Sequence, residues 1–340
     1  MKNYIKFLGI IIMAVIIALA FTACPIEPEE PIPDESTPGT PSGQTPGGQT
    51  HGGGQTPGGG QIPGGGQTPG GSHTDQLVEM VPVTSGTFTM GSPSSETNKN
   101  NETQHTVTLT GFYIGKYEVT QEQYQTVMGT NPSRFISNPT SGETQNKRPV
   151  EQVSWYDALV FCNKLSIREG LSPAYNIKGS TDPAAWGTVP TSVNIPDIAW
   201  NAVTIVSGST GYRLPTEAQW EYACRAGTTT AYNTGASMND NTGWYANNSG
   251  GKTHEVGKKP ANAWGLYDMH GNVYEWCWDW YGDYSIGAQQ TDPLGASSGS
   301  VRVCRSGSYA YAAENARSAS RSSNSPESRS DGLGFRLMRP

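Results

Sequence analysis

Cysteine is scarce in this sequence, with five residues among 340, and no two of them form a Cys-X-X-Cys pair. The absence of such pairs excludes the common structural zinc sites. Cys24 ends an N-terminal apolar run, and the other four are widely spaced at Cys162, Cys224, Cys277 and Cys304. Four cysteines in an exported chain permit two disulfides, but the first two of them fall on apolar faces of expected helices, which favours buried free thiols. The sequence leaves both states open.

Positive charge is also in short supply, because 22 Lys and Arg residues stand against 29 Asp and Glu residues. The net charge of −7 divides into +2 over residues 1–24, −6 over residues 25–76 and −3 over residues 77–340. A nearly neutral, slightly acidic domain argues against nucleic acid as a partner. The last 40 residues hold seven arginines and three acidic residues. We expect internal ion pairs to engage these arginines, and an anionic ligand is the alternative.

Aromatic residues are absent from residues 25–76, of which 10 are proline and 15 are glycine. A segment with so little apolar surface cannot offset the entropy lost on ordering, so we predict a disordered tether. The repeat Gln-Thr-Pro-Gly-Gly begins at Gln44, Gln55 and Gln67. As a flexible coil of about 52 residues, the tether would span on the order of 40 Å and would hold the following domain away from a membrane.

Residues 1–24 have the form of a secretory signal peptide. Two lysines precede a nearly continuous apolar run from Phe7 to Ala23, which is too short for a trusted membrane span. The run ends in small residues before Cys24, and this resembles the lipobox of bacterial lipoproteins. The resemblance implies that Cys24 becomes the lipidated N-terminus, since nothing around it could bury a structural cysteine. We therefore expect a lipid-anchored protein of the bacterial cell envelope, at the outer-membrane surface, that touches the membrane through this anchor only.

The remaining residues, 77–340, are expected to fold as one α+β domain. Capping residues predict three short helices that begin at Thr120, Ser154 and Pro215, the first ending at Gly129 and the third at Gly227. Alternating apolar and polar residues predict strands at Val81–Met90, Thr106–Tyr117, Arg302–Cys304 and Phe335–Met338.

Tryptophan is concentrated in the middle of this domain, because all nine lie between Trp155 and Trp280. Regular elements are few for a domain of this length, and long segments are rich in Gly, Ser, Thr and Asn. We therefore expect aromatic side chains to pack beneath the irregular loops and stabilise them.

Four blocks of the domain resemble, in order, those of the formylglycine-generating (sulfatase-modifying factor) family. They are residues 148–155 (RPVEQVSW), 211–223 (GYRLPTEAQWEYA), 265–276 (GLYDMHGNVYEW) and 332–336 (GLGFR). The resemblance spans nearly all of residues 77–340. It implies the elaborated C-type-lectin-like fold of this family, which has a small twisted antiparallel sheet, two or three helices and extensive loops.

Enzymes of this family carry, after a Gly-Ser-Trp motif, two cysteines five residues apart that bind copper and activate oxygen. Here the block from Gly307 to Ala316 reads GSYAYAAENA, with Tyr311 and Ala316 at the thiol positions. Neither side chain replaces a thiolate that binds Cu(I), and Cys304 lies before the motif. We therefore predict that the chain is not an enzyme and holds no copper. The alternative is a copper oxidase of the formylglycine-generating type that acts on sulfatase cysteines with relocated thiols.

Calcium-binding relatives suggest a structural metal site in the loop before Trp276. The resemblance implies side-chain ligands from Asp268 and Glu275 and carbonyl ligands from Gly271 and Val273. Carboxylates and carbonyls are the ligands that Ca²⁺ prefers. The alternative is a tight turn in which Asn272 and Glu275 only bond backbone amides.

The stretch from Arg305 to Arg336 resembles the variable region of proteins that retroelements diversify. In such proteins adenine mutagenesis alters Asn codons at surface positions, while scaffold residues such as Arg, Pro and Gly-Phe-Arg stay fixed. The matching positions here hold small, Tyr and Asn side chains, a mixture that adaptable binding surfaces use. The predicted ligand-binding residues are Tyr309, Ala310, Tyr311, Ala312, Asn315, Ser320, Ser322, Ser323, Asn324, Ser325, Ser328, Ser330, Asp331 and Gly332.

These features together predict a surface-displayed lipoprotein whose lectin-like domain presents a diversifiable site, over residues 305–336, for a protein or glycan ligand. We expect a monomer in which Arg317, Arg321 and Arg336 hold the site's loops by internal bonds. The same arginines and serines also build the scaffold of undiversified relatives, so an undiversified accessory lipoprotein of the same fold is a further alternative.

Overall fold

The computed structural model describes residues 76–340 except 97–100, 193–196, 285–286 and 288. All described residues belong to one compact unit within residues 69–340. The predicted signal peptide, Cys24 and the tether up to residue 75 lie outside the described residues. Among the described helices, none has the length and apolar character needed to cross a membrane.

Three capped helices form where the sequence predicts them. They are α1 (Gln121–Met128), α2 (Trp155–Arg168) and α4 (Glu217–Arg225), and each begins with a complete capping box. α1 ends at Gly129 with a φ of 82°. α4 ends at Ala226, which itself adopts a left-handed φ of 45°, one residue before the predicted stop. The short helices are η1 (Gln145–Lys147), η2 (Pro183–Ala185), α3 (Ile198–Asn201) and η3 (Ala313–Ala316).

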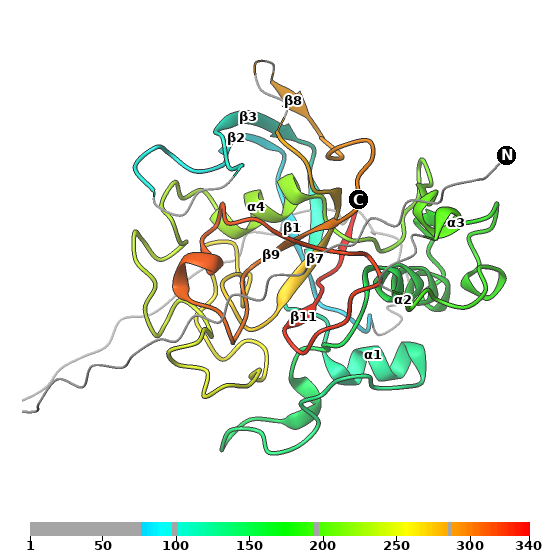
Figure 1. Ribbon diagram of the computed structural model, residues 1–340, viewed down its shortest axis with the longest axis horizontal. Helices are drawn as coiled ribbons and strands as arrows, with labels where there is room; N and C mark the ends of the chain where they lie inside the picture. Colours follow the sequence, from blue (N-terminus) through cyan, green and yellow to red (C-terminus); the bar gives the residue numbers. More distant parts are fainter. Residues whose placement is uncertain (1–75, 97–100, 193–196, 285–286, 288) are drawn as a thin grey trace, which may run out of the picture. The chain divides into compact units, whose positions relative to one another are not determined.

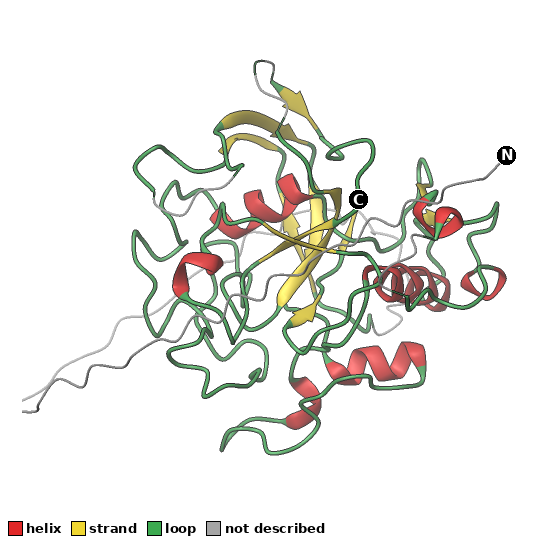
Figure 2. Cartoon of the chain, viewed as in Figure 1, coloured by secondary structure: helices red, strands yellow, loops and turns green. Residues whose placement is uncertain are grey.

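The strands of the described residues form four small sheets (Figures 1 and 2). The largest has the order β10-β9-β7-β11, with β7 antiparallel to β9 and parallel to β11. Its strands are Ser322–Asn324, Arg302–Arg305, Tyr274–Trp280 and Leu333–Gly334. The others are β1-β4-β12 (Met80–Val83, Phe112–Gly115, Met338–Arg339), β2-β3-β8 (Gly86–Met90, His105–Leu109, Gln290–Thr291) and β5-β6 (Tyr175–Asn176, Thr204–Ile205).

The strand predictions locate strand-forming sequence but merge neighbouring strands. The predicted strand Val81–Met90 is β1 and β2, which pair with β4 and β3 in different sheets. Thr106–Tyr117 likewise divides into β3 and β4. The predicted strand Phe335–Met338 is wrong except at Met338, where β12 begins. Arg302–Cys304 is confirmed as β9. Periodicity within a segment carries no information about where the chain leaves one sheet for another, which is why these boundaries are wrong.

The central sheet is buried on both faces. Trp276 and Cys304 belong to the apolar cluster that contains much of α2, whereas Cys277 and Val303 pack with Trp220 of α4. The four cysteines of the domain are free and buried, so the free-thiol alternative is confirmed and the two disulfides are not formed.

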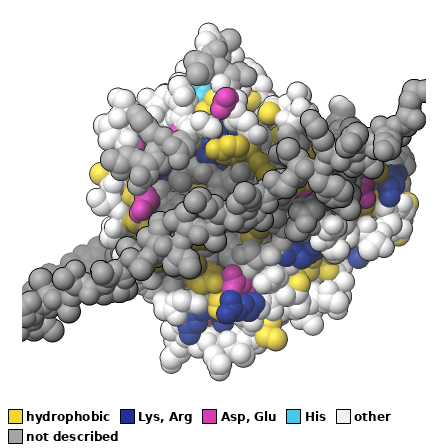
Figure 3. All heavy atoms as spheres, viewed as in Figure 1, with side chains coloured by type: hydrophobic (Ala, Val, Ile, Leu, Met, Phe, Trp, Pro, Cys, Tyr) yellow, Lys and Arg dark blue, Asp and Glu magenta, His cyan; other side chains and the backbone are white. Residues whose placement is uncertain are grey.

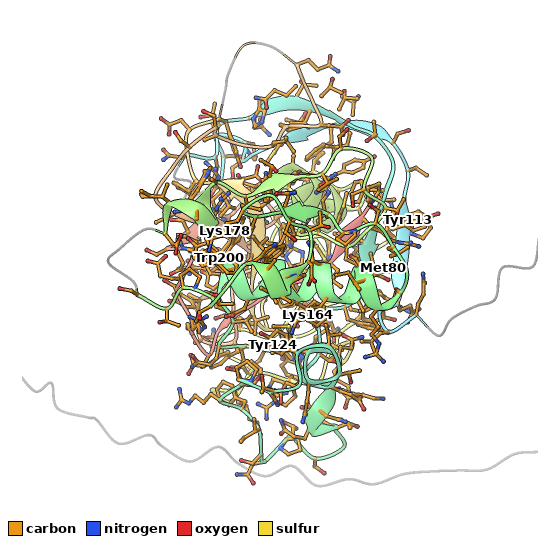
Figure 4. The ribbon with its side chains drawn as sticks, turned by 90° about the vertical axis from the view of Figure 1, so that its right-hand side faces the viewer. Met80, Tyr113, Tyr124, Lys164, Lys178 and Trp200 are labelled. Atoms are coloured by element: carbon orange, nitrogen blue, oxygen red, sulfur yellow. The ribbon has the colours of Figure 1, made fainter. Side chains whose placement is uncertain are left out.

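Aromatic contacts connect the helices to one another and to the central sheet. Figure 4 shows Tyr124 of α1 just below α2, which carries Lys164, and the Tyr124 ring stacks on Phe161 of α2 at 5.5 Å. Trp155 of α2 lies 5.5 Å from Trp278 of β7. These contacts fix the helices against the sheet that carries the predicted binding residues.

Candidate functional site

An open cleft of about 520 Å³ lies at the end of the central sheet where β7 begins. The segment that forms most of it follows β9 and leads to β11 along the chain, and is drawn orange to red in Figure 1. The cleft is lined by Tyr274, Ser308, Ala310, Tyr311, Ser322, Ser323, Asn324, Ser330, Asp331, Gly332 and Leu333. The fold therefore gathers residues from both ends of the predicted variable region into one hollow.

Eight of the fourteen predicted ligand-binding residues line this cleft. Of the whole set, Tyr309 and Gly332 are buried, and the other twelve are exposed or partly exposed. The six that do not line the cleft are Tyr309, Ala312, Asn315, Ser320, Ser325 and Ser328. The predicted set thus lies mainly at the surface, and about half of it faces one shared space.

The two tyrosines of the segment occupy different environments. Tyr311 is 50% exposed, and its ring meets that of Tyr274 edge-on at 5.2 Å. Tyr309 is buried, with its amide donating to the Asn272 carbonyl at 2.9 Å and its carbonyl accepting the Ser249 hydroxyl at 2.8 Å. The backbone is therefore tied to the scaffold, while the Tyr311 ring remains available to a ligand.

Buried ion pairs hold the segment, as predicted for its three arginines. Arg317 pairs with Glu96 and Glu102, and Arg321 makes two bonds of 2.6 and 2.8 Å to Glu217. Burial lowers the pKa of each arginine, but the hydrogen bonds and charges of its neighbours, mainly the partner carboxylates, together outweigh this effect and raise the pKa.

Arg336 and a fourth arginine, Arg305, complete this support. Arg336 grips both oxygens of Glu275 at 2.7 Å. Arg305 was not singled out from the sequence, yet it is fully buried and donates to Glu221 at 2.5 Å and to the carbonyls of Ser318 and Ala319. Internal ion pairs thus engage most of the arginines in the last 40 residues. On the face that Figure 3 shows, the coloured acidic and basic side chains are interspersed.

A titratable carboxyl lies next to the Arg321 anchor. Asp279 of β7 accepts the Glu217 amide at 2.7 Å. Burial, and then the charge of Glu217, raise the pKa of Asp279 from its ordinary 3.8 to about 7. Because this folded-state pKa lies above the unfolded value, the stability that Asp279 contributes is complete below about pH 4 and is lost as the pH rises through 7.

We therefore expect Asp279→Asn to be more stable than the parent at pH 8 and no more stable at pH 4. The asparagine keeps an oxygen for the Glu217 amide but removes the buried charge. Urea unfolding of both proteins at the two pH values measures this. A variant whose stability falls with pH as steeply as the parent's would show that another group is responsible.

The positions of the copper-binding thiols hold exposed Tyr311 and buried Ala316. Cys304 lies beneath the cleft, where the Asn324 side chain donates to its sulfur at 3.7 Å. Burial raises the pKa of Cys304 and of the three other domain cysteines. A raised pKa disfavours the thiolate that binds Cu(I), so the described thiols are poorly suited to copper.

Of the predicted calcium ligands, Glu275 already accepts three hydrogen bonds on its two oxygens. Both its oxygens accept bonds from Arg336 at 2.7 Å, and Trp220 Nε1 donates to one of them at 2.7 Å. The guanidinium therefore supplies the positive charge that Ca²⁺ would supply. As arranged, this carboxylate does not fit the role of a calcium ligand.

Among the other predicted calcium ligands, hydrogen bonds engage one oxygen of Asp268 and the carbonyl of Gly271. The Asp268 carboxylate accepts the Gly257 amide at 2.7 Å, and the Gly271 carbonyl accepts the Ser306 hydroxyl at 3.0 Å. Asp268 Oδ1 is buried without a hydrogen-bond partner. At Val273 the amide donates to Glu118 at 3.1 Å. Within the described part of the chain, no group of three or more His, Cys, Asp or Glu side chains is placed to hold a metal.

Calcium binding at this loop, which the resemblance to calcium-binding relatives predicts, can be tested with melting curves. From the contacts above we expect the same melting midpoint in calcium and in a chelator, because Arg336 already neutralises Glu275. A midpoint that rises with calcium and falls with the chelator would restore Asp268, Gly271, Val273 and Glu275 as ligands.

The family described as the sulfatase-modifying factor enzyme 1-like domain matches residues 67–340. Chaperone protein LppX of Paenibacillus barcinonensis is 43% identical over 223 residues, which cover 60% of this chain and 72% of that protein. The formylglycine-generating enzyme of Mus musculus is 30% identical over 287 residues, 76% of this chain and 74% of that protein. Among solved structures, Treponema denticola variable protein 1 is 42% identical with a TM-score of 0.69, over 77% of this chain and 95% of that one. The chain belongs to the sulfatase-modifying factor family and has the C-type-lectin-like fold of formylglycine-generating enzymes.

Proposed function

We propose that this protein is a non-catalytic binding module whose lectin-like domain presents a diversifiable site for a protein or glycan ligand. The observation that carries the proposal is the cleft, because eight residues predicted to vary line it, while the side chains of the arginines predicted to stay fixed are buried in ion pairs elsewhere in the domain. Side chains can change on such a surface at little cost in stability. The likeness to Treponema denticola variable protein 1 supports the same reading.

The wider proposal is that a lipid on Cys24 anchors the protein at the outer surface of a bacterial envelope, with the Pro- and Gly-rich tether between anchor and domain. In this proposal the protein is a monomer and does not bind nucleic acid. Its support is the signal-like sequence and lipobox of residues 1–24. Metabolic labelling with a fatty acid, compared between the parent and Cys24→Ser, tests the anchor directly. Equal labelling of both would remove Cys24 from the proposal.

Sequencing of the DNA beside this gene tests diversification. We expect a reverse-transcriptase gene and a near-copy of the stretch that encodes residues 305–336, differing only at adenines. Sibling copies of the gene should differ at the fourteen predicted positions and agree at Arg317, Arg321 and Arg336. Invariance at the predicted positions would favour the undiversified accessory lipoprotein.

An oxidase is the second candidate, favoured by the 30% identity to the formylglycine-generating enzyme of Mus musculus. It requires a thiol pair other than the one that Tyr311 and Ala316 replace. Purified protein that binds Cu(I) tightly and converts the cysteine of a sulfatase peptide would establish the oxidase and end the binding-module proposal. The buried, high-pKa thiols lead us to expect neither result.

A further inference from the structure

A loop outside the variable region, residues 131–137, borders the cleft. Its Arg134 guanidinium forms an ion pair with Asp331, which lines the cleft. Its next residue, Phe135, places its ring edge-on to Tyr309 at 5.1 Å. The 131–137 loop is therefore in direct contact with two of the predicted ligand-binding residues.

Buried polar groups hold the 131–137 loop in place. The Glu151 carboxylate is fully buried and accepts the amides of Arg134 and Phe135 at 3.0 and 2.9 Å, one on each oxygen. The Phe135 carbonyl accepts the side-chain amides of Gln121 and Gln145. A loop whose backbone is fixed in this way avoids the cost of ordering its backbone at binding.

Residues 151–152 also hold the end of the variable segment. Gln152, the residue after Glu151, donates its amide to the Ser330 carbonyl at 2.9 Å and has a left-handed φ of 63°. Ser330 lines the cleft beside Asp331. Residues 151–152 therefore set the distance between the 131–137 loop and the end of the variable segment.

The 131–137 loop exposes side chains that its own packing does not require. The Arg134 side chain is 66% exposed and Ile136 is 59% exposed. Apart from the Asp331 pair, no side-chain hydrogen bond of Arg134 is made within the described residues. A guanidinium has five N–H donors, so most of its donors remain for a ligand.

We propose that Arg134 is a constant anchor of the binding surface and that the partner is a protein that presents an Asp or Glu side chain to it. This inference rests on the proposed binding function. Arg and Tyr are the residue types that carry much of the binding energy of protein interfaces. Arg134 contacts Asp331 at the cleft, and Tyr311 contacts Tyr274 there. Asp331 pairs with Arg134 within the chain and therefore competes with an acidic side chain of the partner. A change of residue 331 thus also changes how strongly Arg134 attracts that side chain.

The test is selection of random dodecapeptides displayed on phage, with the full chain as the target and an array of neutral oligosaccharides as a parallel probe. We expect enriched peptides to contain Asp or Glu and Arg134→Ala to weaken their binding at least tenfold without moving the melting midpoint. Arg134→Glu should abolish binding, and a peptide whose acid is replaced by Lys should restore it. Arg168→Ala, which changes an exposed arginine at the end of α2, serves as the matched control and should bind as the parent does.

Two further variants separate failure of this inference from failure of the proposed function. If Tyr311→Ala and Ser323→Arg weaken a selected peptide but Arg134→Ala does not, the cleft binds ligand and the anchor is wrong. If none of the three variants changes binding, the cleft is not the site and the proposed function fails as well. Enrichment without acidic peptides, or binding of oligosaccharides alone, would overturn the protein partner.

Discussion

Arg336→Met is expected to lower the free energy of unfolding by about 3 to 5 kcal/mol, the cost of leaving one member of a buried ion pair unpaired. Arg336 is fully buried and grips Glu275 through two bonds of 2.7 Å. It also donates to the carbonyls of Gly115 and Tyr267 at 2.9 Å. The variant leaves a buried carboxylate without its cation and two carbonyls without their donor. The variant also loses the ion pair with Glu275 that joins the end of the variable segment to β7.

Urea unfolding measures this loss, and two further variants identify its cause. Arg336→Met combined with Glu275→Gln should recover part of the stability, because it removes the unpaired charge. Arg168→Met, at an exposed arginine, should change stability by less than about 0.5 kcal/mol. A loss below about 1 kcal/mol for Arg336→Met, or no recovery in the double variant, would mean that the pair does not anchor the sheet.

Helix positions were predictable because their signals are local. The capping box that begins α1 is complete within Thr120–Gln123, and Gly129 supplies the left-handed end. β7 is not among the predicted strands, although Tyr274–Trp280 alternates aromatic side chains with Glu275, Cys277 and Asp279. The resemblance to calcium-binding relatives assigns the start of this strand to a calcium-binding turn, and that interpretation competes with the strand pattern.

The site was predictable only where it lies within one stretch of chain. The resemblance to variable regions located Tyr311 and Asp331, and the arginine excess indicated internal pairs. The identity of each partner was beyond reach, because Glu275 is 61 residues from Arg336 and is joined to it only by the fold. Arg134 had no signal at all, since an exposed arginine in a polar loop is ordinary until the structure places it beside Asp331.

Gly271 lies where two segments of backbone touch. It has a φ of 94°, and its amide donates to the Ser306 carbonyl at 2.7 Å. A Cβ at this position would stand 2.0 Å from the Trp244 carbonyl oxygen. The next residue, Asn272, donates its amide to that same carbonyl at 2.8 Å, so the oxygen cannot move away without breaking a bond. These contacts hold the turn from which β7 and Tyr309 are positioned.

Gly271→Ala is therefore expected to lower the free energy of unfolding by more than about 3 kcal/mol, since overpacking against backbone adds to the strain of a left-handed alanine. Gly129→Ala is the matched control, because Gly129 has a φ of 82° but no atom within 4 Å of the added Cβ. The Gly129→Ala variant has only the strain of a left-handed alanine, and its free energy of unfolding should fall by only about 1 kcal/mol. Soluble yield and urea unfolding of the two variants distinguish strain from contact. Equal losses would show that the Trp244 carbonyl yields, and that the turn before β7 is not the rigid support that the binding surface requires.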